Sequence, residues 1–159
     1  METPQERNDN PVVRRLQQLE PGLAAEVLEY RGEMAVVVPR ERIRRACELL
    51  RSDAELQFTF LSDVSGVDRF PVEPRFEVNY HLLSLYRRER IRLKVRVPGA
   101  NPVVESVTSV WPTANWHERE VFDLFGVRFE GHPDLRRILM PDNWEGHPLR
   151  KDYPVEGYR

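Results

Sequence analysis

Two carboxylates and four histidines are the residues of this sequence whose types and spacing could support catalysis. Glu120 and Asp123 lie three positions apart, so on a helix they would share one face, as a general acid and a general base require. Together with His132 they would form the active site of a free-standing enzyme, which is one hypothesis for this chain. The structural alternative is that Arg119 and Asp123 form a helical ion pair four positions apart. Glu118 and Glu120 would then favour the helix N-terminus through its dipole.

Metal and cofactor chemistry finds little support in the sequence. A zinc site would have to use His132 and His147, and each of them precedes a proline within a bend. Their spacing, with Asp134 or Asp142 as a further ligand, matches no helix-borne or knuckle pattern. Cys47 is the only cysteine, which excludes an intrachain disulfide and any cysteine-cluster metal or iron–sulfur site. No glycine-rich phosphate loop or Gly-x-Ser-x-Gly elbow occurs, so we expect no catalytic, cofactor-binding or metal site on this chain.

Composition and charge exclude several other classes. The chain has 159 residues, of which 40% are hydrophobic and 31% are charged, and this is typical of one soluble globular domain. Its longest apolar run, 34–38, is far shorter than the ~20 residues of a membrane span, and the polar N-terminus shows no secretory signal. A net charge of −2 gives no global basic footprint for nucleic acid. A nucleic-acid module or an acidic partner could use only one basic stripe, which we interpret as a solvated strand face: Arg90, Arg92, Lys94 and Arg96.

The hydrophobic periodicity predicts the elements that must position these residues. Helix spacing predicts helices at 11–20 and 40–51, and Cys47 lies in the buried stripe of the second. Period-two alternation predicts strands at 24–30, 33–38, 56–61, 77–86 and 91–97. Because the strands come in runs rather than alternating with helices, we expect an α+β fold. It would contain a mixed or antiparallel sheet of about four to five strands with flanking helices.

A short helix is expected at 115–125, where the candidate acid–base residues lie. Asn115 would cap its N-terminus, and Glu118, three residues later, would reach back to that cap. Gly126 would end the helix in a left-handed turn. Beyond Gly126 we find no sustained helix or strand period.

The remaining C-terminal segment, 127–159, is too apolar for a solvated tail. Two similar bends, 130–133 and 145–148, share the sequence Glu-Gly-His-Pro, and each precedes a pair of basic residues. Aromatic and arginine anchors on an irregular segment are typical of a protein interface. We therefore divide the chain into a flexible N-terminus (1–10), an α+β globular domain (11–126) and an extended C-terminal docking arm (127–159).

One long motif of fixed spacing spans the predicted helix and the docking arm. It reads Glu-Arg-Glu, two residues, an acid, two apolar residues, six residues, His, three residues, a base, one residue and two apolar residues. In this sequence every position is filled: by Glu118-Arg119-Glu120, Asp123, Leu124-Phe125, His132, Arg136 and Ile138-Leu139. This motif, together with most of 24–154, closely resembles the 30-kDa subunit family of respiratory complex I, the proton-pumping NADH:quinone oxidoreductase.

The resemblance implies a structural subunit without a catalytic site of its own. Members of the family belong to the peripheral arm and pack on the 49-kDa subunit, which their C-terminal arm wraps. FMN and iron–sulfur clusters in partner subunits pass electrons from NADH to quinone, and protons are pumped in the membrane arm. For this chain we therefore expect no cofactor, no membrane span and no nucleic-acid partner, and a peripheral position on the cytoplasmic face of the cell inner membrane.

We expect a set of charged, aromatic and histidine residues to form the partner interface. The set comprises Glu118, Arg119, Glu120, Asp123, His132, Arg136, Arg137, Trp144, His147, Arg150, Lys151, Asp152 and Tyr153. The helix members would fix the origin of the docking arm, its basic groups would make charge-assisted hydrogen bonds, and Trp144 and Tyr153 would be its anchors. Related machines share the motif. The alternative is therefore the homologous component of a membrane-bound energy-converting hydrogenase or of an F420H2 or ferredoxin:quinone oxidoreductase.

Overall fold

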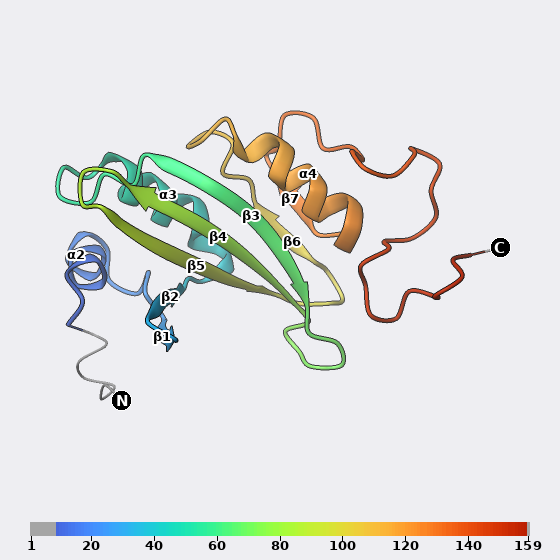
Figure 1. The fold of residues 1–159 in the computed structure, drawn as a ribbon, viewed down its shortest axis with the longest axis horizontal. Helices are drawn as coiled ribbons and strands as arrows, with labels where there is room; N and C mark the ends of the chain where they lie inside the picture. The colour runs from blue at the N-terminus through green and yellow to red at the C-terminus, as the bar shows by residue number, and fades with distance from the viewer. Residues whose placement is uncertain (1–8, 159) are drawn as a thin grey trace.

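The computed structural model describes residues 9–158, and Figure 1 shows how its elements are arranged. The predicted flexible N-terminus, 1–10, lies outside the described residues except for its last two, of which Asn10 caps the first helix through its side chain. The elements are α2 (Pro11–Leu19), β1 (Glu26–Tyr30), β2 (Glu33–Val37), η1 (Arg40–Arg42), α3 (Ile43–Ser52), β3 (Phe60–Asp68), β4 (Phe76–Ser84), β5 (Glu89–Val97), β6 (Val103–Glu105), α4 (Ala114–Phe125) and β7 (Arg128–Glu130).

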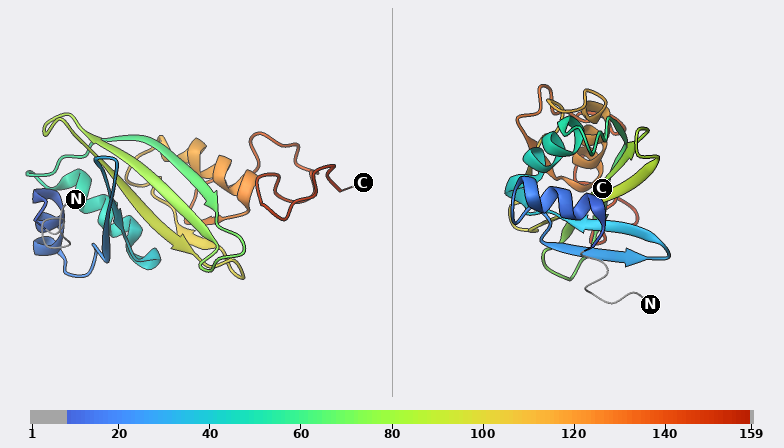
Figure 2. Two further views of the ribbon diagram at one scale, coloured as in Figure 1. Left: turned by 60° about the horizontal axis from the view of Figure 1, so that its bottom comes forward. Right: turned by 90° about the vertical axis from the view of Figure 1, so that its left-hand side faces the viewer.

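Five strands form one mixed sheet in the order β1-β2-β5-β4-β3. β2 and β5 run parallel, with Ala35 opposite Arg92, and all other neighbours in this sheet are antiparallel. The predicted α+β fold with a mixed sheet of four to five strands is confirmed. Figure 2 shows that α2 and the C-terminal segment lie at opposite ends of the molecule.

One face of the sheet buries the core against the helices. Inward positions alternate along each strand, so Tyr80 on β4 and Leu93 and Val95 on β5 have no exposed surface. They belong to one cluster with the apolar stripe of α3, which includes the predicted core residue Cys47. Burial raises the pKa of the Cys47 thiol, as expected of a packing residue rather than a nucleophile.

The opposite face of the sheet carries the basic stripe of β5. Three members pair with carboxylates of neighbouring strands: Arg92 with Glu33 at 2.6 Å, Lys94 with Glu77 at 2.8 Å and Arg96 with Glu26 at 3.1 Å. Such pairing leaves little free positive charge for the phosphates of a nucleic acid. The stripe is a strand face with mutually compensating charges, as interpreted from the sequence.

α4 lies along β3 on the side of the core, as Figure 1 shows. The close approach requires Gly66 of β3, because a Cβ there would lie 2.7 Å from the Phe125 ring. β3 occupies 60–68 rather than the predicted 56–61. A register shift between Leu61 and Asp63 breaks the alternation of the strand, and this irregularity concealed its second half from a period-two search.

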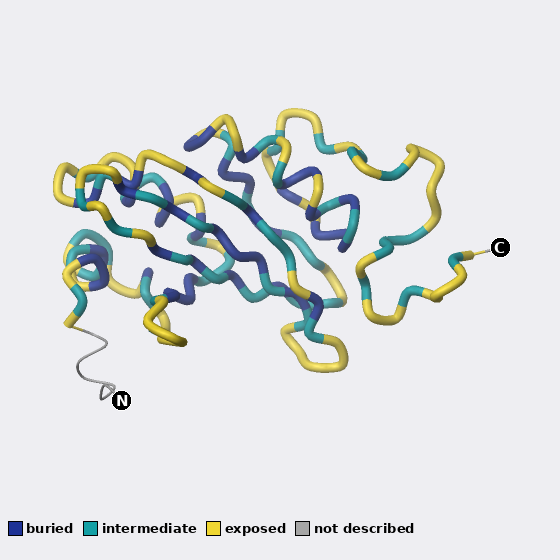
Figure 3. The backbone as a smooth tube through the Cα atoms, in the orientation of Figure 1, coloured by how far each residue is buried: buried dark blue, intermediate teal, exposed yellow. Residues whose placement is uncertain are grey.

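The body of the molecule continues past the predicted boundary at 126. β7 pairs in parallel with β6, and Val127 and Phe129 are buried in the core cluster. Two strands of three residues each contain too little alternation to be predicted. We call 9–130 the body and 131–158 the strap; the strap contains no helix or strand in its described residues. Figure 3 shows its backbone largely exposed or half-buried, whereas the sheet is largely buried.

Candidate docking site

The strap is held first by one side chain of α4, Asp123. Its Oδ2 accepts hydrogen bonds from three consecutive backbone N–H groups, those of Ile138 at 3.1 Å, Leu139 at 2.7 Å and Met140 at 2.9 Å. Its Oδ1 accepts from Arg137 Nη1 at 2.7 Å. Burial acts to raise the pKa of the Asp123 carboxyl, but these donors outweigh it and the pKa is lowered. Asp123 is therefore an enclosed anion that shapes the strap.

Arg137 ties two turns of the strap to this carboxylate. Besides pairing with Asp123, its guanidinium donates to the carbonyl oxygens of Trp144 at 2.9 Å and Gly146 at 2.8 Å. The side chain is 13% exposed, so these bonds lie mostly out of water. Because one planar group contacts both α4 and a bend nine residues later, Arg137 fixes the path of the strap between them.

The strap also caps the C-terminus of α4. Helix ends leave carbonyl groups without intrahelical partners, and here Gly126 ends the helix at φ 76°, as predicted. Strap donors satisfy the last three carbonyls: Asp123 O accepts from His147 Nδ1 at 2.9 Å, Leu124 O from the Leu149 N–H at 3.0 Å and Phe125 O from Arg150 Nε at 2.6 Å. The guanidinium groups near this end are also favourable for the helix dipole.

Arg119 contacts the strap from the preceding turn of α4. Its guanidinium donates to the carbonyl oxygens of Arg136 at 3.1 Å and Arg137 at 2.9 Å, and it lies 5.1 Å from the centre of the Trp116 ring. The predicted ion pair of Arg119 with Asp123 is therefore wrong. Each of the two side chains instead binds the strap, which offers carbonyl oxygens to the cation and N–H groups to the anion.

Glu118 faces the body rather than the strap. It has no exposed surface, and its carboxylate accepts from the Val107 N–H at 2.7 Å and from the Ser106 hydroxyl at 2.7 Å. The predicted capping by Asn115 and Glu118 is wrong, because the helix begins one residue earlier, with Thr113 before it. Burial raises the pKa of the Glu118 carboxyl to about 7, against the lowering effect of its two donors.

A second attachment holds the end of the strap to the β3–β4 hairpin. Arg75 makes two bonds of 2.9 Å to Asp68 and donates to Asp152 Oδ1 at 2.7 Å. The Lys151 N–H donates to Asp68 Oδ2 at 2.8 Å. The Arg75 guanidinium holds the pKa of the Asp68 carboxyl well below its usual range, assisted by the Lys151 N–H. The charged pair Arg75 and Asp68 was missed in the sequence because nothing in the spacing linked it to the strap.

The polar contacts of the strap turn inward, and its large apolar side chains turn outward. With Trp116 of α4, the exposed fractions are 61% for Trp116, 60% for Leu139, 41% for Trp144, 52% for Leu149 and 54% for Tyr158. The Trp144 indole N–H donates to the Tyr153 hydroxyl at 3.1 Å, so both predicted anchors are oriented by each other. Clustered exposed apolar side chains mark a binding surface more often than isolated ones do.

The structure reverses the direction predicted for several interface residues. Glu118, Arg119 and Asp123 are buried, so they do not offer a partner an exposed surface in this conformation. The basic groups Arg137 and Arg150 bind carbonyl or carboxylate oxygens of their own chain. The members that are exposed are Glu120, Arg136, Trp144, Lys151 and Asp152. Spacing and composition do not indicate the direction of these side chains, because an oxygen of this chain and one of a partner satisfy arginine equally well.

The residues of the enzyme hypothesis do not converge on one cavity. Asp123 is enclosed by donors, while Glu120 is exposed. His132 Nε2 contacts the Asn115 carbonyl at 3.1 Å, and its Nδ1 accepts from the Asp134 N–H at 3.0 Å. Both ring nitrogens of His132 are therefore engaged in shaping the first bend of the strap.

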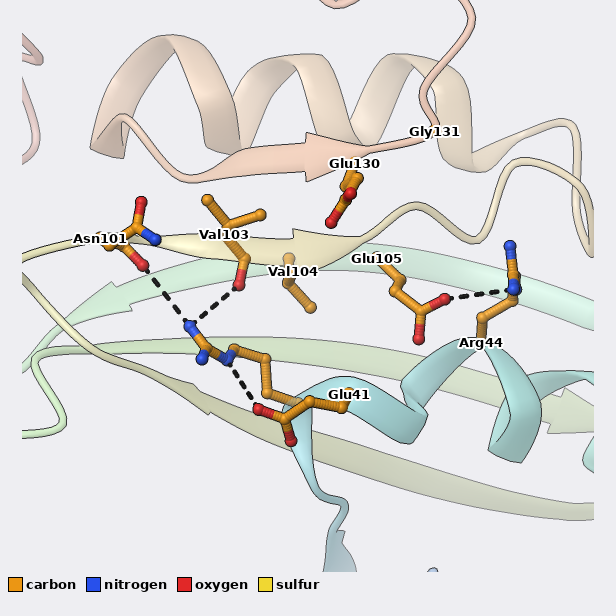
Figure 4. Close-up of a pocket in the computed structure, with 9 residues that line it drawn as sticks. Glu41, Arg44, Asn101, Val103, Val104, Glu105, Glu130 and Gly131 are labelled. Carbon is orange, nitrogen blue, oxygen red and sulfur yellow. Dashed lines mark hydrogen bonds and ion pairs between the residues drawn. The ribbon is translucent and has the colours of Figure 1, made fainter.

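A polar groove of about 580 Å³ beside β6 contains paired charges (Figure 4). Arg40 donates to Glu41 at 3.3 Å and to the Val103 carbonyl at 3.4 Å, and Arg44 pairs with Glu105 at 3.3 Å. The residues that line it include no serine, cysteine or histidine. Across 9–158, no three His, Cys, Asp or Glu side chains gather as metal ligands, and no helix is long and apolar enough to cross a membrane.

Comparisons with known proteins agree with the motif found in the sequence. Residues 36–159 match the family described as "Respiratory-chain NADH dehydrogenase, 30 Kd subunit". The C-type subunit of NADH-quinone oxidoreductase from Roseiflexus castenholzii is 55% identical over 148 residues, which cover 92% of this chain and 85% of the relative. The same subunit from Geobacter sulfurreducens is 51% identical over 133 residues, covering 83% of this chain and 81% of the relative.

Two solved structures share the fold. The trypsin-resistant fragment (1-134) of Nqo5 is 37% identical with a TM-score of 0.63, and the match covers 77% of this chain and 99% of that chain. A chain of the membrane-bound sulfane sulfur reductase, an archaeal respiratory membrane complex, is 26% identical with a TM-score of 0.76, covering 91% of this chain and 84% of that chain. The matched length of the family model and the identity to the two bacterial relatives are decisive: the chain belongs to the 30-kDa subunit family of the respiratory-chain NADH dehydrogenase.

Proposed function

We propose that this chain is a non-catalytic assembly subunit in the peripheral arm of a proton-translocating NADH:quinone oxidoreductase. It binds the 49-kDa subunit and neighbouring peripheral-arm subunits on the cytoplasmic face of the cell inner membrane. FMN and iron–sulfur clusters of the partner subunits carry electrons from NADH to quinone, and this chain holds no cofactor. Membership of the family and 55% identity to the Roseiflexus castenholzii relative support this assignment.

One observation carries the proposal: the strap satisfies its polar groups inside and presents its apolar groups outside. A segment that only covered its own body would bury Leu139, Trp144 and Leu149, because each buried side chain of this size stabilises a fold by about 1.5–3 kcal/mol. Here they stay exposed while Asp123 and Arg137 fix the backbone beneath them. The strap is therefore pre-organised for a partner, which lowers the entropic cost of binding.

The proposal assigns different tasks to the predicted interface residues. Direct contacts come from Glu120, Arg136, Trp144, Lys151 and Tyr153, joined by Trp116, Leu139 and Leu149. Positioning from beneath comes from Arg119, Asp123, His132, Arg137, His147, Arg150 and Asp152, which hold the strap in shape, and Glu118 supports α4 from the body.

The test is co-purification of the tagged subunit with its complex from the source membrane. We expect the double variant Leu139→Ala/Trp144→Ala to recover at least about tenfold less of the partner subunits, since truncating central apolar anchors costs more than 1 kcal/mol each. Mass spectrometry of the wild-type eluate should identify the 49-kDa subunit. The absorbance of the eluate should show flavin and iron–sulfur clusters.

The matched control is Tyr30→Ala/Leu85→Ala, which removes two side chains of the body that are each 71% exposed. Tyr30 ends β1 and Leu85 follows β4, so neither lies on the strap. This control should recover partners as the wild type does. Equal loss in both double variants, or no loss in either, contradicts docking through the strap. An eluate without any other respiratory subunit contradicts the assembly role itself.

A related machine is the second candidate, favoured by the TM-score of 0.76 to a chain of the archaeal sulfane sulfur reductase complex. The two candidates differ in the electron donor of the whole complex. NADH oxidation coupled to quinone reduction by the purified complex supports the first, whereas a complex that lacks FMN and does not oxidise NADH supports the second.

A further inference from the structure

A small groove lies between β3 and α4 on the side of the molecule where the strap is attached. Its apolar walls are Val121, Leu124 and Phe125 of α4 and Leu149 of the strap, and its polar rim is formed by Asp63 of β3 and Glu120 of α4. The groove therefore exists only when the strap is in place. The hydrogen bond from the Leu149 N–H to the Leu124 carbonyl, at 3.0 Å, fixes the wall that the strap contributes.

The size of the groove restricts what it receives. Its volume is about 190 Å³, whereas pockets for cofactors and drug-sized ligands measure roughly 300–1,000 Å³. Since a water molecule takes about 30 Å³ of liquid volume, the groove has room for about six waters or one long side chain. A single inserted side chain from another protein fits this volume, as anchors at interfaces do.

The charges of the groove select the chemistry of that side chain. Asp63 and Glu120 are both carboxylates, and none of the residues that line the groove is basic. His117 of α4 lies beside this rim, with its Nδ1 3.2 Å from Asp63, and it is a cation only when protonated. No described residue forms a hydrogen bond or ion pair with the Glu120 carboxylate, which is exposed. Within the Glu118-Arg119-Glu120 motif, it is the one side chain that the fold leaves unused.

We propose that this groove receives one arginine side chain from a neighbouring subunit of the complex. The apolar stem of the arginine packs on Val121, Leu124 and Leu149, and its planar guanidinium forms ion pairs with Glu120 and Asp63. This inference rests on the proposed assembly function. It gives the strap a second task, because ordering the strap completes the pocket for a partner's anchor.

The first test replaces the charge at the rim in the assembled complex. Glu120→Gln keeps the shape and removes the charge, and Glu120→Arg reverses it. Because the carboxylate is exposed and makes no ion pair with any described residue, both variants should keep the thermal midpoint of the wild type. We expect Glu120→Arg to lower recovery of the complex at least about tenfold and Glu120→Gln to lower it less, as for a charge pair that becomes desolvated on binding. The control Glu29→Arg, an exposed carboxylate on β1 at the opposite edge of the sheet, should have no effect.

The second test identifies the occupant. A photo-crosslinking amino acid in place of Ser65, which lines the groove, should capture a segment of another subunit that contains an arginine within about two residues of the crosslink. The same amino acid at Glu29 should not capture that segment. A captured segment without arginine overturns the proposal, as does wild-type recovery of the complex with Glu120→Arg. These failures leave co-purification of the wild type intact, whereas a wild-type subunit that recovers no partner refutes the assembly function instead.

Discussion

The body and the strap of this molecule are held together by different kinds of interaction. The body buries an apolar sheet face against helices, and its inward strand residues have almost no exposed surface. The strap has no regular structure in its described residues, and side chains such as Asp123 and Arg137 bind its backbone groups. The body is therefore shaped by what it excludes from water, whereas the strap is shaped by polar groups that its own chain provides.

This difference has a consequence for stability. Burial of a shared apolar core makes the body cooperative, so it unfolds as one unit. Hydrogen bonds that lie near solvent, with few apolar contacts behind them, open at lower free energy than the core does. We expect the strap to be released locally while the body stays folded, and the following predictions test this separation.

The largest effect is expected from a cavity in the sheet. Leu93 of β5 is fully buried and lies opposite Val36 and Tyr80 in the register. Leu93→Ala should lower the free energy of unfolding of the whole chain by about 2–5 kcal/mol, measured by chemical denaturation. Arg90→Ala, on the outer face of the same strand, should stay within about 0.5 kcal/mol of the wild type. A loss under about 1 kcal/mol for Leu93→Ala would show that the body is not one cooperative unit.

The next effect is a pH dependence that belongs to the body. The pKa of the buried Glu118 carboxyl is about 7, against an ordinary value of 4.5. The native state therefore holds a proton between these values that the unfolded state has lost, so stability decreases as pH rises. The contribution is complete below pH 4.5 and is lost by about pH 7, with a total of about 3 kcal/mol.

The variant Glu118→Gln isolates this contribution, because glutamine resembles the protonated acid and does not titrate. The stability of the wild type relative to the variant should decrease between pH 4.5 and 7 and stay constant above, measured by denaturation at several pH values. A difference that does not change with pH would contradict burial of a titrating carboxyl at this position.

A smaller, local effect is expected from the central guanidinium of the strap. Arg137→Ala removes the bonds to Asp123, Trp144 and Gly146, of which a charge-assisted bond is worth about 1.5–3 kcal/mol. Trypsin should then cleave the strap after Arg150 or Lys151 at least about tenfold faster, while the thermal midpoint of the body stays close to that of the wild type.

Arg136→Ala is the matched control for this prediction. Arg136 is the adjacent arginine, its side chain is 66% exposed, and its guanidinium pairs with the exposed Asp134 of the same bend, so cleavage should hardly change. Equal acceleration in both variants, or cooperative unfolding of the body in Arg137→Ala, would show that strap and body are one unit.

The sequence was sufficient for elements with a long, regular apolar period. α2, α3, β4 and β5 each have enough turns or alternations to be recognised, and Cys47 followed from its place in the stripe of α3. The three-residue strands β6 and β7 were missed because they pair with each other across more than twenty residues of chain. Local periodicity contains no information about such a pairing.

The candidate site was predictable in its residues but not in its directions. The motif correctly marked Arg119 and Asp123 as residues that organise the strap, because charged groups of fixed spacing on a helix and an irregular segment need partners. Whether those partners belong to the same chain depends on the path of the strap. That path is set by contacts between residues far apart in sequence, such as Arg75 with Asp152.

The smallest effects compare two exposed carboxylates that each pair with an arginine. Glu33 is 70% exposed and pairs with Arg92 within the body, while Asp152 is 48% exposed and joins the strap to Arg75. Exposed pairs contribute about 0–1 kcal/mol, so neither Glu33→Gln nor Asp152→Asn should shift global unfolding by more than that. Hydrogen exchange should still distinguish them, because Asp152→Asn weakens the bond that ties this residue to the hairpin. The amide of Lys151, which donates to Asp68, should then exchange a few times faster, whereas Glu33→Gln should leave it unchanged. Unchanged exchange in both variants would assign the hold on the end of the strap to Asp68 alone.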